Sequence, residues 1–184
     1  MSDAVSAGLA AVRAELRALA DPARAAGASR FFKTGPGEYG EGDRFLGLTV
    51  PQIRSVVRAH RATQVDDALA LLDSPWHEER LCAVLLLVEA HARGDERARQ
   101  AVLDAYLARA ATHVNNWDLV DASAEYLVGE YLLDGDTGGE PLLDELAASD
   151  SLWERRVAVL GTFAFTKGGD GGPILRLADR KSVV

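Results

Sequence analysis

The sequence predicts an all-α protein, folded as a HEAT-like solenoid of helical repeats with a concave groove. Alanine, leucine, glutamate and arginine dominate almost every segment, and the alternation of β-branched residues that marks strands is absent. Trp76, Trp117 and Trp153 lie 41 and 36 residues apart, each near the start of a predicted helix. A period near 40 residues with two helices per unit is typical of HEAT-like repeats.

Two segments also resemble each other directly. The string "SPWHEERLCAVLLL" at 74–87 is similar to "DSLWERRVAVLGTF" at 150–163. Both have a polar cap, a tryptophan, an acid followed by arginine, and then Ala-Val-Leu. Because stacked repeats place equivalent positions along one surface, the tryptophan helices are predicted to line one groove.

Capping residues predict where most of the helices begin. Thr49 and Gln52 form a capping box, Ser74 followed by Pro75 is predicted to open a long helix, and Asn116 is predicted to cap the helix that contains Trp117. Short loops join the predicted helices, which cover residues 2–19, 22–33, 50–61, 65–73, 75–93, 95–113, 117 to the break at 134–140, 141–149, 151–167 and 172–181.

The longest predicted loop covers residues 34–47, where "TGPGEYGEGDRFLG" holds five glycines and a proline. It has no Lys-Ser/Thr ending and follows no strand, so it is not a phosphate-binding loop of the P-loop type. Lys33, Tyr39 and Arg44 lie in or beside it and can reach a nucleic-acid phosphate. The whole chain, residues 1–184, is predicted to form a single domain.

Composition narrows the class of protein. The chain has 48% hydrophobic residues, no apolar run of the roughly 20 residues that a membrane span needs, and no signal-peptide pattern. With Cys82 as its one cysteine, it cannot form an intramolecular disulfide, and a cytoplasmic location is predicted. The net charge of −8 divides into +3 for residues 1–61 and −11 for residues 62–184, which still permits a local basic face.

Several kinds of site are disfavoured by spacing. The histidines show no HExxH pattern and have no cysteine partners, so no metal site and no cofactor are predicted; they are His60, His77, His91 and His113. Cys82 lies in an apolar run and is predicted to be a small core residue.

Trp117 and Asp121 are spaced i, i+4, so a helix carries them on one face. Asp118 falls in the first helical turn, where an acid favours the helix N-terminus. Asp121 lies beyond that turn, and it is either a site residue or a solvated surface acid. Arg156 follows Trp153 by three residues, and it is either a site residue or the partner of an acid such as Glu125 or Asp121.

Three strings resemble the AlkD-like DNA alkylation repair family, bacterial HEAT-repeat glycosylases that remove N3- and N7-alkylated purines. They are "RFFKTGPGEYGEGDRFLGLTVPQIR", "NNWDLVDASAEYLVGEYL" and "SLWERRVAVLGTFAF", and the likeness runs from about residue 29 to 180. The resemblance implies that Asp121 is catalytic, that Trp117 flanks the lesion and that Arg156 contacts the DNA backbone. Phe31 falls where the family has an aromatic residue, which is tyrosine in some members.

The chemistry implied by the resemblance needs only one carboxylate. A purine such as 7-methylguanine is already cationic, so it leaves without a general acid, and the deoxyribose becomes oxocarbenium-like. Asp121 would stabilise that charge, Trp117 and Trp153 would press against the lesion nucleotide, and Arg156 and Lys33 would contact the DNA.

The family continues past this point with another helix pair and a further tryptophan, whereas this sequence ends at "LRLADRKSVV". A shortened last repeat predicts an exposed apolar end, weak catalysis or a dimer through that end.

The resemblance therefore implies a DNA glycosylase acting on alkylated bases in double-stranded DNA, bacterial and nucleoid-associated. The alternative is a non-catalytic HEAT-like module that binds structured DNA or a protein partner.

Overall fold

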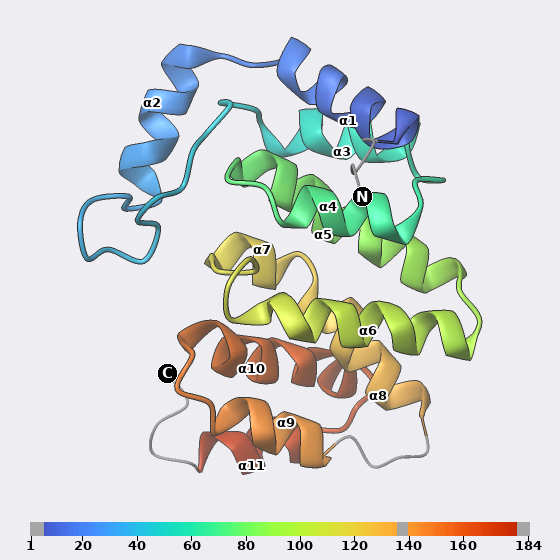
Figure 1. The fold of residues 1–184 in the computed structure, drawn as a ribbon. Coiled ribbons are helices and arrows are strands. Elements are labelled where there is room, and N and C mark those ends of the chain that lie inside the picture. The colour runs from blue at the N-terminus through green and yellow to red at the C-terminus, as the bar shows by residue number, and fades with distance from the viewer. Residues whose placement is uncertain (1–5, 136–139, 180–184) are drawn as a thin grey trace. The chain divides into compact units, whose positions relative to one another are not determined.

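The computed structural model describes residues 6–135 and 140–179, and over these residues the regular secondary structure is helical, apart from one isolated β-bridge (Figure 1). The all-α prediction is confirmed, and the paired helices are compatible with a helical-repeat solenoid. The chain divides between Ala90 and His91 into two compact units, and each is described by itself.

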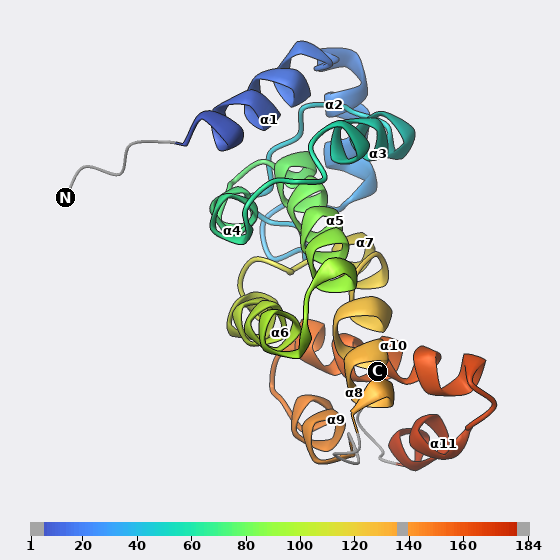
Figure 2. The ribbon, with the colours of Figure 1, turned by 90° about the vertical axis from the view of Figure 1, so that its right-hand side faces the viewer.

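The first unit is built from five helices, the last of which, α5, continues a few residues past the division. They are α1 (Ala7–Ala18), α2 (Pro22–Phe31), α3 (Val50–Ala59), α4 (Val65–Leu72) and α5 (His77–Arg93). Helix α1 contacts both α3 and α4 (Figure 2). It buries Leu9, Val12 and Leu16, whose spacing of three and four residues places them on one face. Cys82 of α5 is fully buried, as predicted.

The start of α5 differs from the prediction. Ser74 and Pro75 do not open the helix, which begins at His77. The backbone of this stretch pairs with the loop instead: Arg44 N–H donates to the Pro75 carbonyl at 3.1 Å, and His77 N–H donates to the Arg44 carbonyl at 2.8 Å. The Ser74 hydroxyl accepts from Trp76 N–H at 3.1 Å and so caps a turn. The bridge holds Pro75 to His77 beside the backbone of Arg44, so the helix begins only where this pairing ends.

Other helix boundaries follow local sequence. The predicted capping box is present, with the Gln52 side-chain oxygen accepting from Thr49 N–H at 2.9 Å. Helix α1 is capped by Ser6, and residues 2–5 of the predicted first helix lie outside the described residues. Helix α2 ends just before Lys33, which has a φ of 51°, a left-handed conformation that a helix cannot continue through.

The second unit holds the remaining helices. They are α6 (Glu96–Ala110), α7 (Trp117–Asp121), the π-helical turn η1 (Glu125–Gly129), α8 (Glu130–Asp134), α9 (Glu140–Ala147), α10 (Leu152–Lys167) and α11 (Gly172–Ala178). Within this unit α6 runs antiparallel to the α7–α8 segment, and α9 runs antiparallel to α10 (Figure 1).

The helix predicted from Trp117 is interrupted. Helix α7 ends at Asp121, and a turn and the π-helical η1 follow before α8. The buried Ser123 hydroxyl donates to the Leu119 carbonyl at 2.7 Å and lies 2.9 Å from the Tyr106 hydroxyl of α6. A serine that bonds back to the preceding turn bends a helix, and π-helical turns are frequent at functional sites.

The α7–α8 segment and α10 run in the same direction and approach closely. A Cβ built on Gly129 would lie 2.3 Å from the Gly161 carbonyl oxygen, far inside any real contact. Residues further along one segment contact residues further along the other. The contacts are Asp121 with Arg156, Gly129 with Gly161, and Leu133 with Gly168. Parallel packing of this kind is expected for equivalent helices of neighbouring repeats.

Gly129→Ala is expected to lower the free energy of unfolding by about 1–3 kcal/mol, because its methyl group forces α10 away. The control is Gly27→Ala inside α2, where a Cβ meets nothing within 4 Å. There the better helix propensity of alanine is expected to add up to about 1 kcal/mol. Urea unfolding measures both. Equal changes in the two variants would contradict the close approach.

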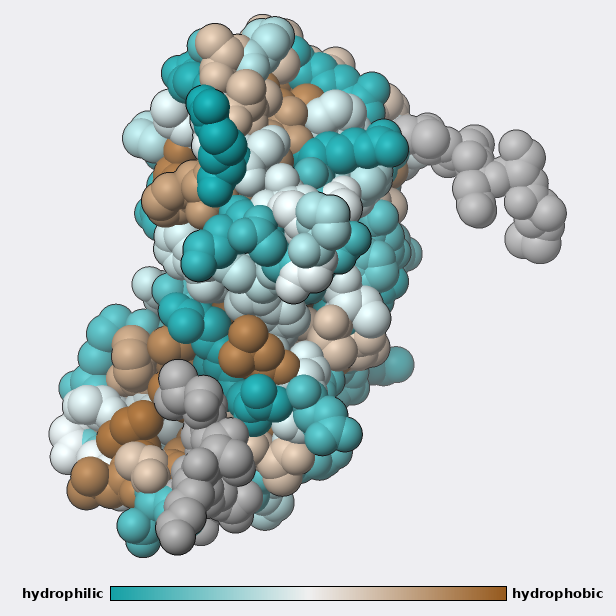
Figure 3. Space-filling model, turned by 90° about the vertical axis from the view of Figure 1, so that its left-hand side faces the viewer, coloured by the Kyte–Doolittle hydropathy of each residue, from teal (hydrophilic) through white to brown (hydrophobic). Residues whose placement is uncertain are grey.

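Large hydrophobic side chains also reach the surface of the second unit, including Leu152 and Phe163 of α10 and Leu175 of α11. Figure 3 shows hydrophobic side chains gathered on one face of this unit, in the lower half of the view. The predicted dimer stays a prediction, and the mass measured by light scattering checks it.

His91 is buried, and its burial followed by the charge of Arg99 lowers its pKa to about 4 from an ordinary 6.5. Between pH 6.5 and 4 the unfolded chain therefore binds a proton that the folded chain excludes, so stability falls as the pH falls. Between pH 7 and 5 the wild type is expected to lose about 1–2 kcal/mol more unfolding free energy than His91→Gln. Urea titrations at both pH values measure this. Identical losses would exclude a neutral buried His91.

Candidate functional site

Asp121 and Arg156 form a two-pronged ion pair. Asp121 is the last residue of α7, and Arg156 lies in the second turn of α10. The arginine Nε donates to Asp121 Oδ1 at 2.7 Å, and Nη2 donates to Oδ2 at 2.9 Å. Each side chain is 38% exposed. The hydrogen bonds to Asp121 raise the pKa of Arg156. Of the two acids named as partners for Arg156, Asp121 is the one it contacts.

A tryptophan precedes each member of this pair. Trp117 is the first residue of α7, one helical turn before Asp121, and Trp153 is the second residue of α10, three residues before Arg156. Both indoles are half-buried. The predicted cap is present, since the buried Asn116 side chain accepts from Trp117 N–H at 2.9 Å. The start of α7 is therefore held where the sequence places it.

Phe31 and Lys33 belong to the first unit. Phe31 is the last residue of α2, and the residue is 65% exposed. It meets Phe32 edge-on, with ring centroids 5.1 Å apart, and Phe32 in turn stacks on Phe45 at 5.3 Å. One phenylalanine thus anchors the end of α2 while its neighbour faces solvent.

Glu78 holds the end of the glycine-rich loop, a role that was missed in the sequence. Its buried carboxylate accepts from the backbone N–H groups of Leu46 at 2.8 Å, Gly47 at 2.7 Å and Leu48 at 3.2 Å. Gly47 has a φ of 83°, and a Cβ there would lie 2.1 Å from the Asp21 carbonyl oxygen. A glycine ending the loop was visible in the sequence, but the acid that reaches it lies about 30 residues away.

The repeated strings carry a second arginine–aspartate pair. Arg80 and Arg156 are each the seventh residue of the strings at 74–87 and 150–163. Arg80 Nη2 donates to Asp43 at 2.7 Å, and both side chains are only 4% exposed. His77 and Arg80 together hold the pKa of Asp43 below its ordinary value although burial opposes this. The Arg80–Asp43 pair is buried inside its unit, whereas the Arg156–Asp121 pair is accessible to solvent.

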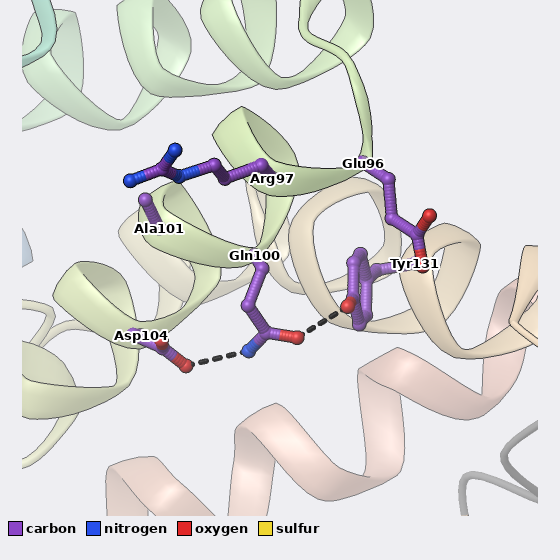
Figure 4. A pocket seen from close by; sticks show the side chains of 6 residues that line it. All are labelled: Glu96, Arg97, Gln100, Ala101, Asp104 and Tyr131. Atoms are coloured by element: carbon purple, nitrogen blue, oxygen red, sulfur yellow. Dashed lines mark hydrogen bonds between the residues drawn. The ribbon is translucent and has the colours of Figure 1, made fainter.

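A surface pocket of about 470 Å³ lies between α6 and α8, lined by Glu96, Arg97, Gln100, Ala101, Asp104 and Tyr131. Gln100 bridges Asp104 and the Tyr131 hydroxyl (Figure 4). None of the predicted site residues lines this pocket, and three of its polar side chains bond to one another.

Among the residues that the structure describes, no group of three or more histidine, cysteine, aspartate or glutamate side chains is placed to hold a metal ion. No helix in the described part of the chain is long and apolar enough to cross a membrane.

Comparison with curated proteins finds no match to this sequence. Comparison with protein families does: the family described as "DNA alkylation repair enzyme" matches residues 12–182, almost the whole chain, including Asp121 and Arg156. The chain therefore belongs to the DNA alkylation repair enzyme family.

Proposed function

We propose that this protein is a monofunctional DNA glycosylase that excises cationic N3- and N7-alkylated purines from duplex DNA in base excision repair. The family supports a repair enzyme acting on alkylated DNA. The observation that carries the finer proposal is Asp121, an accessible carboxylate that ends α7 with a tryptophan one turn before it. A carboxylate with an aromatic neighbour suits a cationic, flat and partly sugar-like transition state.

In the proposed reaction the bond from the sugar to the purine breaks first, and the bonding electrons leave with the base. Because alkylation has already made the purine cationic, it departs neutral and needs no general acid. Positive charge develops on the deoxyribose, and the Asp121 carboxylate stabilises it. One preorganised group of this kind contributes roughly 3–4 kcal/mol. Water then adds to the sugar carbon and loses its proton to Asp121 or to solvent.

The other predicted residues position the substrate. Trp117 and Trp153 would present their indole faces to the lesion nucleotide. Arg156 would bind the adjacent phosphate, a two-pronged acceptor like the carboxylate it now contacts. Phe31, exposed at the end of α2, and Lys33 would contact the DNA from the first unit.

The second candidate function is a non-catalytic module that binds structured DNA or a protein. The ion pair favours it, because a carboxylate compensated by Arg156 has no spare negative charge to offer a substrate. The net charge of −8 also weakens general attraction to DNA.

Incubation of excess protein with a methylated duplex separates these functions. A glycosylase releases 7-methylguanine faster than spontaneous depurination does. A DNA-binding module binds the duplex, with a logarithmic salt slope of about 0.9 per phosphate contacted, but releases no base. A protein-binding module leaves the duplex unbound even at low salt.

A further inference from the structure

The Asp121–Arg156 pair engages both carboxylate oxygens and two of the three guanidinium nitrogens. Both Asp121 oxygens accept, one from Nε and one from Nη2. Within the described residues, Arg156 Nη1 makes no hydrogen bond, and no other charged side chain pairs with Arg156. The negative charge of Asp121 is therefore compensated, while the arginine keeps an open side.

The accessibility of this pair distinguishes it from its counterpart in the first unit. Arg80 and Asp43 are each 4% exposed, and Arg80 also donates to the Ser74 carbonyl at 3.1 Å. Separating those two charges would leave each buried away from water and without its main charged partner. Arg156 and Asp121 are each 38% exposed, so water can solvate either partner once the pair opens.

A DNA phosphate competes for the same edge of Arg156. A carboxylate and a phosphate each offer two oxygens that can accept two parallel N–H bonds from a guanidinium. Two arrangements can follow when DNA binds. Arg156 exchanges Asp121 for the phosphate, or it keeps Asp121 and binds the phosphate through Nη1.

We propose that the pair is an autoinhibitory latch, which a backbone phosphate of duplex DNA opens by taking Arg156 from Asp121. The proposal rests on the catalytic role given to Asp121 above. While the latch is closed, the arginine cancels the field that a cationic sugar would meet. Once it opens, Asp121 stands uncompensated beside an anionic strand, and the positive charge of the transition state relieves that repulsion.

Affinity for undamaged duplex DNA tests the latch without any chemistry. If Asp121 competes with phosphate, Asp121→Asn leaves Arg156 available and tightens binding. The expected gain is about two- to fivefold, the range for an exposed ion pair. The gain should disappear in the Arg156→Gln background, where there is no guanidinium to release.

The control is Glu125→Gln, which removes one negative charge from the same segment and breaks a second ion pair to α10, with Lys167 at 2.5 Å. Its effect should be unchanged by Arg156→Gln. Fluorescence anisotropy at one fixed salt concentration measures all five proteins and the wild type. Circular dichroism confirms that each variant is folded.

The bridging arrangement predicts the opposite sign, because Asp121 would then orient Arg156 and its loss would weaken binding. Weaker binding by Asp121→Asn, or a gain no larger than that of Glu125→Gln, would overturn the latch and leave the proposed glycosylase standing. No duplex binding by any of the proteins would remove the latch and the glycosylase together.

Discussion

Asp121→Asn is expected to slow the release of 7-methylguanine by about 10²–10³-fold, the usual cost of one preorganised group that stabilises transition-state charge. Asparagine has nearly the shape of aspartate but no charge, so the stabilisation of the sugar cation is lost while packing is kept. The residue is 38% exposed at the end of α7, and folding is expected to be almost unaffected. Single-turnover release from methylated duplex DNA, with protein in excess, measures the chemical step without the product-release step.

Glu125→Gln is the matched control for that experiment. Glu125 lies four residues after Asp121 and, like it, pairs with a cation of α10. The substitution removes one negative charge near α10, as Asp121→Asn does, and release is expected to stay within about threefold of wild type because Glu125 has no part in the proposed chemistry. An Asp121→Asn protein with full activity would show that Asp121 is a surface acid. Equal losses in both variants would show a general charge effect.

Glu78→Ala is expected to have the largest effect on stability, lowering the free energy of unfolding by about 3–5 kcal/mol. The substitution leaves the N–H groups of Leu46, Gly47 and Leu48 without their acceptor in a buried region. It also removes side-chain volume from the start of α5. Urea unfolding followed by tryptophan fluorescence measures the loss.

Glu41→Ala is the control for Glu78→Ala, because Glu41 also accepts from a backbone N–H of the same loop, that of Gly37 at 2.8 Å. Glu41 is exposed, so water replaces its carboxylate when it is removed, and the expected change is within about 0.5 kcal/mol. If the two variants lost the same stability, Glu78 would not be the anchor of the loop.

Residues close together in the chain determined much of this protein. Several features depend only on groups within four residues of one another. They are the helical class, the capping box at Thr49 and Gln52, the Asn116 cap and the shared face of Trp117 and Asp121. The three strings that resemble the repair family likewise lie within the span that the family comparison matches. Such features can be predicted because their interactions are local and follow helical geometry.

Contacts between distant residues decided the rest. Helix α5 starts late because the backbone of Arg44, about 30 residues earlier, forms hydrogen bonds with the backbone of Pro75 and His77. Helix α7 ends at Asp121, just before Ser123 meets Tyr106 of α6. Neither partner is implied by the local pattern of apolar and polar residues.

The clearest example is Arg156, whose partner the sequence left open between two acids. Both acids lie along the segment that packs against α10, and each forms an ion pair with a basic side chain of α10. In the tertiary structure Asp121 meets Arg156 near the start of α10, and Glu125 meets Lys167 at its end. The choice depends on the direction and closeness with which two segments pack. That packing is set in part by Gly129 and Gly161, because side chains there would hold the helices apart.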